Sequence, residues 1–176
     1  AFLSMKDMPT SQPDGLWLTA ISYREDPADC LVLRKDRATQ GQLLQLPPNS
    51  IVGTSSARRK AQLRAFRPDV QLQDIRGNVP TRLQKLRDGQ YDAIVLAMAG
   101  LNRLKADLSD FVDLRLNPKE FIPAPAQGVL AWQTKVDDLS TRRILRKLHQ
   151  RDVLDCTNVE RKVLRLLDGG CHLPLG

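Results

Sequence analysis

Short apolar runs recur along the chain and are separated by polar or amphipathic stretches. Each run is four to six residues long and is bounded by polar or turn-forming residues, which is typical of β-strands. The runs lie at 16–21, 30–33, 50–53, 70–75, 93–98 and 129–132. The apolar start at 1–3 leads directly into Ser4 and favours a further strand there.

Four other segments repeat their apolar positions at the helical spacing. The first can begin on a Ser56 N-cap, and the second on an Asn78 N-cap with Pro80 in its first turn and Gly89 after its end. The segments are 56–66, 78–88, 139–149 and 152–167. In the last two we expect these apolar side chains to face the core: Ile144, Leu145, Leu148, Val159, Val163, Leu164 and Leu167.

The order of these elements predicts the fold class. With 176 residues, 41% of them apolar, the chain is long enough to bury a core. Strand, helix, strand, helix, strand between 50 and 98 predicts βαβ units, an α/β fold and a parallel sheet whose ligands bind at the carboxyl ends of the strands. Pro118, Pro123 and Pro125 interrupt 117–127, which predicts a linker or hinge and a domain boundary.

The net charge of +7 lies entirely between Thr54 and Arg87. This segment holds nine Lys and Arg against two Asp, and the rest of the chain balances at eighteen against eighteen. A single arginine would more often be a solvated surface residue, but several at helix starts along one sheet edge suit a ligand with several carboxylates. The arginines concerned are Arg58, Arg59, Arg76 and Arg82.

Other anionic partners fit the sequence less well, although a pI of about 9.7 permits them. The basic segment has one aromatic residue, Phe66, and no zinc-finger, RRM or KH signature. Residues 53–60 lack the Gly-Lys-Ser/Thr ending of a Walker A loop. No apolar run reaches the length of about 18 residues that spans a bilayer, and no signal peptide is visible. We therefore expect no nucleic acid, no membrane and a cytoplasmic location, and a nucleic-acid-binding domain stays the weaker alternative.

The cysteines and histidines predict reduced thiols and no metal. Cys30, Cys156 and Cys171 lack the C-x-x-C spacing of zinc or redox sites, and we expect Cys30 and Cys156 to be buried. Cys171 follows two glycines, which can present a reactive thiol at a loop tip, although a lone cysteine is more often buried. His149 and His172 have no partner at metal-ligand spacing.

Several motifs together resemble the porphobilinogen deaminase family, whose members are also called hydroxymethylbilane synthases. The match in order and spacing covers essentially the whole chain, with departures from the usual family residues at Leu3, Ala126 and Trp132. The motifs are Ser4-Met5-Lys6-Asp7, Arg24-Glu25-Asp26-Pro27, Gly53-Thr54-Ser55-Ser56-Ala57-Arg58-Arg59, Arg76-Gly77-Asn78-Val79-Pro80-Thr81-Arg82-Leu83, Pro125-Ala126-Gln127-Gly128 and Gly169-Gly170-Cys171.

The resemblance implies a transferase that joins porphobilinogen units into hydroxymethylbilane and releases ammonia. It implies a dipyrromethane cofactor, the primer, bound by a thioether to Cys171. Without the resemblance, Lys6 and Asp7 would be interpreted as an ordinary surface ion pair. With it, Asp7 carries over as the catalytic carboxylate that stabilises a cationic pyrrole and moves protons. The arginines expected to hold the acetate and propionate groups are Arg58, Arg59, Arg76, Arg82 and Arg103. The assisting polar residues are Ser4, Lys6, Ser56, Asn78 and Gln127.

The resemblance also implies a type II periplasmic-binding-protein-like architecture, in a monomer. It assigns 1–21 with 121–145 to part of a first domain, 22–120 to a second domain, and 146–176 to the start of a third domain that carries the cysteine loop. Family members extend beyond both ends of this sequence, so we expect the isolated chain to be poorly active or inactive. A non-catalytic carboxylate-binding module on the same fold is the alternative, and it would need neither Asp7 nor Cys171.

Overall fold

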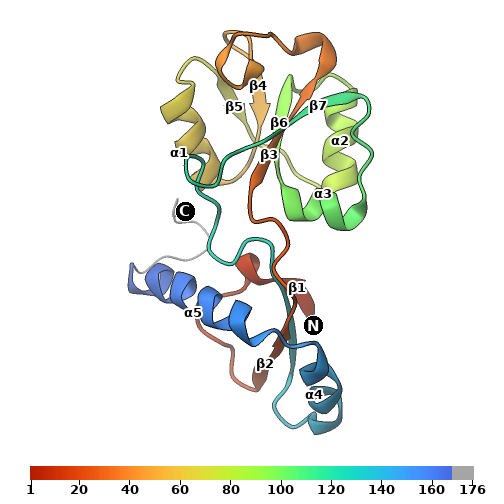
Figure 1. Cartoon of the computed structure of the whole chain (residues 1–176), viewed down its shortest axis with the longest axis vertical. Coiled ribbons are helices and arrows are strands. Elements are labelled where there is room, and N and C mark those ends of the chain that lie inside the picture. Colours follow the sequence, from red (N-terminus) through yellow and green to blue (C-terminus); the bar gives the residue numbers. More distant parts are fainter. Residues whose placement is uncertain (168–176) are drawn as a thin grey trace. The chain divides into compact units, whose positions relative to one another are not determined.

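The computed structural model describes residues 1–167, which form two compact units (Figure 1). Unit 1 consists of Ala1–Pro27 and the described part of Ala124–Gly176, and unit 2 is Ala28–Pro123. The chain passes between the units twice, once after Pro27 and once after Pro123. The division into three domains stays a prediction, and Cys171 lies outside the described residues.

Unit 2 is built on a mixed five-stranded sheet in the order β5-β4-β6-β3-β7. Its strands are β3 (Asp29–Arg34), β4 (Ile51–Gly53), β5 (Gln71–Gln73), β6 (Ala93–Ala97) and β7 (Phe111–Arg115). β4 is parallel to β5 and β6, as the sequence predicts, but β3 is antiparallel to both β6 and β7. The pattern could not show this, because β3 is buried on both faces and reads as the same apolar run in either direction.

Three helices cover the two faces of this sheet (Figure 1). They are α1 (Ala57–Phe66), α2 (Val79–Arg87) and α3 (Met98–Leu104). Leu63 of α1 belongs to the buried cluster on one face, whereas Leu86 of α2 and Leu101 of α3 belong to the cluster on the other. Successive residues of β3 alternate between these clusters, with Cys30 in one and Leu31 in the other, so the predicted burial of Cys30 is confirmed.

The predicted N-caps of α1 and α2 are confirmed. The Ser56 hydroxyl accepts a hydrogen bond from Arg59 N at 3.4 Å, and the Asn78 side-chain oxygen accepts from Thr81 N at 3.0 Å. Gly89 after α2 has φ +75°, which glycine adopts without strain. These signals are local in sequence, and the bounds of both helices therefore agree with the prediction to within one residue.

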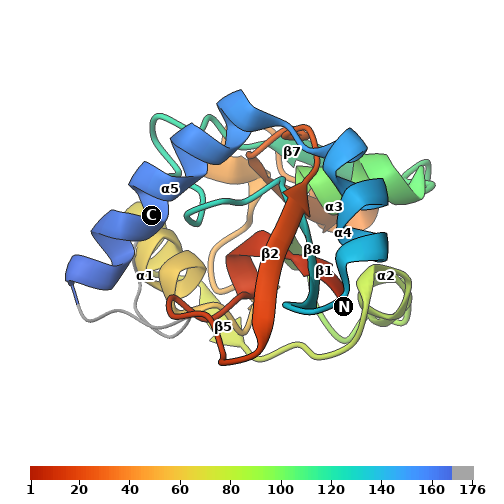
Figure 2. The same ribbon diagram turned by 90° about the horizontal axis from the view of Figure 1, so that it is seen from below.

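Unit 1 contains a three-stranded antiparallel sheet in the order β1-β8-β2. Its strands are β1 (Phe2–Ser4), β2 (Leu16–Ile21) and β8 (Leu130–Lys135), and its helices are α4 (Leu139–Leu145) and α5 (Arg151–Leu166). In the view from below, β2 lies between the two helices (Figure 2). The core forms around Met5, Ile21 and Val129, and Val153 and Leu154 at the start of α5 pack against it.

The predicted burial of one apolar face on α4 and α5 is wrong. Ile144 and Val159 are 67% and 66% exposed, and among the side chains expected to be buried only Leu164 is, at 8%. Helical spacing shows that one face is apolar, but it does not show whether another element covers that face. Cys156, also expected to be buried, is exposed on α5. The other side chains that are exposed or only half-buried are Leu145, Leu148, Val163 and Leu167.

A partly buried ion pair ties α5 to both connecting segments. Arg24 Nη1 and Nη2 contact the two carboxylate oxygens of Glu160 at 2.5 and 3.1 Å, and Arg24 Nε donates to Gln127 O at 3.0 Å. The same Glu160 carboxylate accepts from Ala126 N at 2.7 Å. The segments on either side of the passage to unit 2 are therefore fixed to one helix.

The three departures from usual family residues differ in their local surroundings. Leu3 packs against the core of unit 1. Trp132 lies opposite Phe2 across β1 and β8, with ring centroids 5.4 Å apart. Ala126 has φ +60°, in the left-handed region where an alanine carries strain that a glycine does not.

Gly128 gives a test of the connecting segments. It has φ +90°, and an added Cβ would lie 2.3 Å from Glu25 O, so we predict that Gly128→Ala lowers the free energy of unfolding. The expected loss is about 3 kcal/mol, because backbone strain and overpacking act together. Gly15→Ala is the matched control, since Gly15 has φ +76° but nothing within 4 Å of its added Cβ. It should cost about 1 kcal/mol. Equal losses in urea unfolding would contradict the close approach to Glu25.

Candidate functional site

Two consecutive arginines at the start of α1 share one buried carboxylate. Arg58 and Arg59 are 5% and 6% exposed, and Asp29, the first residue of β3, is fully buried. Asp29 Oδ2 accepts from Arg58 Nη2 at 2.7 Å, and its Oδ1 accepts from Arg59 Nη2 and Nε at 2.6 and 3.1 Å. Arg58 Nη1 also donates to Ile122 O at 2.5 Å, and Arg59 Nη1 to Val95 O at 2.9 Å. Both guanidinium groups are therefore held in fixed orientations.

These residues lie at the sheet edge at which the sequence predicts a ligand site. Gly53 ends β4, and Ser56 caps α1, so Arg58 and Arg59 occupy the first turn after a parallel strand. Asp29 lies opposite Ala97, the last residue of the parallel strand β6. The carboxyl ends of β4 and β6 thus bring residues from α1 and β3 together.

A third arginine adds to the positive charge of this cluster. Arg82 in α2 is half-buried, and its Nε donates to Gly77 O at 2.7 Å. Burial lowers the pKa of Arg82, and the charge of Arg59 lowers that pKa further, so the two cations act on each other. Within residues 1–167 no acidic side chain forms an ion pair with Arg82. The site thus has three positively charged guanidinium groups and one negatively charged carboxylate, that of Asp29. We call Asp29, Arg58, Arg59 and Arg82 the arginine cluster.

The electrostatics of the arginine cluster keep Asp29 ionised. Burial raises the pKa of the Asp29 carboxyl, but the charges of Arg59 and Arg58 and their hydrogen bonds outweigh burial and hold that pKa below its usual value of 3.8. Burial lowers the pKa of Arg58, and the charge of Asp29 opposes this shift. Arg58 Nε is buried and has no acceptor among residues 1–167. The cluster therefore keeps a net positive charge and one buried N–H group without an acceptor in this part of the chain.

The other predicted site residues of unit 2 lie in or just before its helices. Ser56 and Asn78 use their side-chain oxygens to cap α1 and α2. Arg76 is exposed just before α2, and Arg103 is half-buried in α3. The contacts described above join Arg58 and Arg59 through Asp29, with Arg82 near enough for its charge to act with that of Arg59. Arg76 and Arg103 belong to the same unit.

Unit 1 contains the predicted catalytic carboxylate and its neighbours. Ser4 ends β1, and Lys6 and Asp7 follow in a 3₁₀ turn (Met5–Asp7). Met5 N anchors this turn by donating to Val129 O at 2.9 Å. Lys6 is half-buried and Asp7 is exposed. The turn thus presents the Asp7 carboxylate at the surface of unit 1.

Gln127 joins the two connecting segments. Its side chain is 1% exposed, its Nε2 donates to Pro27 O at 2.6 Å, and its backbone N donates to Ala124 O at 2.9 Å. This geometry fixes the end of the first segment to the start of the second. Cys171, the predicted attachment residue, lies outside the described residues.

Sequence reasoning missed Asp29. The signal for it was present, because Asp29 is the single acidic residue at the head of an apolar run that is buried throughout. Aspartate is seldom fully buried unless it is paired, so its position predicts a basic partner. The identity of that partner could not be predicted, because Arg58 and Arg59 lie 29 and 30 positions further along the chain.

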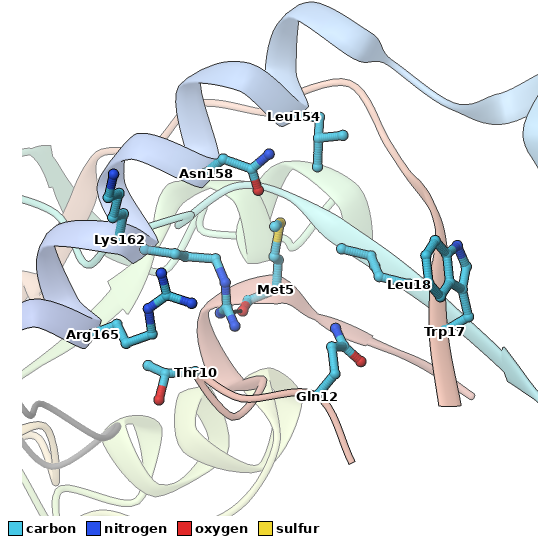
Figure 3. Close-up of a pocket in the computed structure, with 10 residues that line it drawn as sticks. Met5, Thr10, Gln12, Trp17, Leu18, Leu154, Asn158, Lys162 and Arg165 are labelled. Atoms are coloured by element: carbon cyan, nitrogen blue, oxygen red, sulfur yellow. Dashed lines mark hydrogen bonds between the residues drawn. The ribbon is translucent and has the colours of Figure 1, made fainter. Parts of the chain in front are cut away.

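A pocket of about 480 Å³ in unit 1 was also not predicted. Figure 3 shows Lys162 and Arg165 of α5 on one side of it and Trp17 and Leu18 of β2 on the other. Arg161, which also lines the pocket, donates to Met5 O at 3.1 Å, in the turn that carries Asp7, and to Met8 O at 3.3 Å just after it. The pocket therefore adjoins the turn, and Arg161 helps to hold the turn in place.

Among residues 1–167 no three His, Cys, Asp or Glu side chains gather as metal ligands. None of the helices in this part of the chain combines the length and apolarity that crossing a membrane requires. The expected absence of a metal stays a prediction.

Comparison with known proteins gives a consistent family match. Residues 1–143 match the family model described as "Porphobilinogen deaminase, dipyromethane cofactor binding domain". Curated relatives named porphobilinogen deaminase from Syntrophobacter fumaroxidans and Chlorobium phaeobacteroides are 43% and 44% identical to this chain over 173 residues. The alignments cover 98% of this chain but 54% and 53% of those relatives, so the chain spans about half their length.

A solved structure is similar in fold. It is an ABC transporter periplasmic binding protein from Brucella ovis with glutathione bound, at a TM-score of 0.50 and 18% identity, and the match covers 75% of this chain and 40% of that one. At this identity the likeness concerns the fold alone. The predicted α/β architecture of the periplasmic-binding-protein type is confirmed.

Asp29 should make the stability of the chain depend on pH in the acid range. Because its pKa lies below 3.8 in the folded chain, its stabilising contribution is full above the unfolded pKa and is lost as the pH falls through the folded pKa. We predict that the free energy of unfolding falls more steeply below pH 3.8 for the wild type than for Asp29→Asn. Urea unfolding at several pH values measures both. Asp14→Asn, which removes an exposed acid from unit 1, should follow the wild type, whereas parallel curves for wild type and Asp29→Asn would contradict the ion pair.

Proposed function

Since the chain belongs to the porphobilinogen deaminase family, we propose that it forms the part of the enzyme that binds the dipyrromethane primer and carries the catalytic carboxylate. The proposed activity is a transferase reaction of tetrapyrrole biosynthesis, which joins porphobilinogen units into hydroxymethylbilane and releases ammonia. This activity is proposed for the protein that contains the sequence, because the chain spans about half the length of its curated relatives. The isolated chain is proposed to be inactive.

The arginine cluster is the observation that supports this proposal most directly. Porphobilinogen carries an acetate and a propionate group, so each added unit brings two carboxylates to the site. Three guanidinium groups against one carboxylate leave a net positive charge, and the buried Arg58 Nε has no acceptor among residues 1–167. Fixed guanidinium forks with spare donors fit a ligand with several carboxylates.

The proposed holders of the primer are therefore residues of unit 2. Arg58, Arg59 and Arg82 would bind its acetate and propionate groups, and Arg76 and Arg103 are proposed to add further contacts. Ser56 and Asn78 would act by capping the helices that carry these arginines. When bound, the dipyrromethane supplies the pyrrole end to which new units are joined.

Asp7 is proposed to carry the catalytic step. Its exposed carboxylate, on a turn anchored by Met5, would stabilise the positive charge that develops on porphobilinogen as ammonia leaves, and it would hold or transfer a proton at a carboxylate oxygen. Ser4 and Lys6 flank it on the same short element, and we propose that they orient substrate groups. Gln127 is proposed to assist by holding the two connecting segments together.

Several further features are carried by the family resemblance alone. Cys171 is proposed to hold the primer by a thioether, in the cysteine loop of a third domain that starts within 146–176. The other proposed domains are 1–21 with 121–145, and 22–120. We also propose a monomeric protein in the cytoplasm with porphobilinogen as its small-molecule substrate.

Primer attachment gives a direct test of the enzyme against a binding module. Intact-mass measurement of the full-length protein that contains this sequence should show an adduct of two linked pyrroles, and Cys171→Ser should lack it. Cys156→Ser is the matched control, since it removes an exposed thiol from the same chain and should keep the adduct. An unmodified Cys171 thiol in folded full-length protein would favour the carboxylate-binding module, and salt-sensitive binding to many polynucleotides would favour the nucleic-acid alternative.

Substitution of the catalytic carboxylate gives a second test. We predict that Asp7→Asn in the full-length protein lowers the rate of ammonia release by about 10²- to 10⁴-fold, because a general acid and base is lost. The primer adduct should remain, since Asp7 is not its attachment residue. Asp14→Asn, which changes another exposed acid nearby in sequence, should keep the wild-type rate. A rate for Asp7→Asn close to that of the wild type would contradict the assignment.

A further inference from the structure

Asp29 has no part in the motifs or in the proposed catalytic step, yet it is fully buried. The sheet fixes its position, since Asp29 lies opposite Ala97 of β6 and its carbonyl oxygen accepts from Leu116 N at 2.9 Å. Its carboxylate is therefore attached to a rigid point between two neighbouring strands. A charge held in this way can fix the orientation of groups that reach it from another element.

The groups that reach it are long side chains on α1. An arginine side chain has many rotamers, and fixing one of them costs conformational entropy. Asp29 accepts two hydrogen bonds from Arg59 and one from Arg58, while Val95 O and Ile122 O hold the opposite ends of the two guanidinium groups. The orientation is thus set before a ligand arrives, which lowers the entropic cost of binding.

The same contacts leave some N–H groups of the two guanidinium groups unused. A guanidinium has five N–H donors, of which Arg59 uses three and Arg58 two in the contacts above. Arg58 Nε is buried without an acceptor among residues 1–167. Asp29 cancels one of the three positive charges of the arginine cluster, so the cluster keeps a net charge favourable to carboxylates.

We propose that Asp29 is a positioning residue for carboxylate binding, which sets the orientation in which Arg58 and Arg59 receive the carboxylates of a pyrrole ligand. This inference rests on the proposed function of the arginine cluster. A positioning role differs from other roles of Asp29 in the direction in which its substitution changes the affinity for an anion. Loss of a negative charge alone would strengthen the binding of an anion, and a role in folding alone would leave the affinity of the folded chain unchanged. A positioning role requires weaker binding.

The test is a calorimetric titration of the 176-residue chain with porphobilinogen, with the folded fraction of each variant measured by circular dichroism. For Asp29→Asn we expect the affinity per folded molecule to fall at least about tenfold, because charge-assisted hydrogen bonds to both arginines are lost. Asp29→Glu keeps the charge and the ion pair, and it serves if the neutral variant does not fold. Its longer side chain displaces the guanidinium groups, so its affinity should also fall, by about tenfold or less.

Asp69→Asn is the matched control. Asp69 accepts from Arg67 Nε and Nη2 at 2.8 and 2.6 Å, so this variant also removes an ion pair and one negative charge from unit 2 but leaves the arginine cluster unchanged. Its affinity should equal or exceed that of the wild type. Unchanged or tighter binding by the folded Asp29 variants would overturn the positioning role and leave the proposed function standing. A wild-type chain that does not bind porphobilinogen would refute carboxylate binding by the arginine cluster of this chain, and the inference with it.

Discussion

The interaction on which unit 2 depends is the buried carboxylate of Asp29 between two guanidinium groups. Burying two cations is costly unless they are paired and hydrogen-bonded. The same two ion pairs therefore join α1 to β3 and determine the charge of the site. The Ser56 cap begins α1 at the residue that brings Arg58 and Arg59 to Asp29. The fold thereby holds arginines beneath the surface while keeping a positive excess.

Unit 1 supports function by different means. Its turn with Asp7 is anchored through Met5, and the segments that connect it to unit 2 are fixed by Arg24, Glu160 and Gln127. These contacts, which use backbone carbonyls and one ion pair, add to the apolar core around Met5. The carboxylate proposed for catalysis and the arginines proposed for binding therefore belong to separately stabilised parts of the chain.

Local signals in the sequence were sufficient for much of the fold. The caps at Ser56 and Asn78 gave the starts of α1 and α2, and the apolar run of β2 gave its bounds. The direction of β3 and the presence of β7 depend on pairing between distant segments, which an apolar run does not encode. For the same reason the predicted burial of the apolar face of α5 was wrong and the partners of Asp29 were not predicted. Motif resemblance supplied the roles of Asp7 and Cys171, which no spacing argument could assign.

The central claim is that the arginine cluster binds the carboxylates of a pyrrole ligand. The most direct measurement is the NMR signal of each arginine Nε–H group while porphobilinogen is added to the chain. Binding at the arginine cluster should produce saturable shifts at Arg58, Arg59 and Arg82 with a common midpoint. Shifts confined to Arg161 and Arg165 of the unit 1 pocket, with those three signals unchanged, would contradict it.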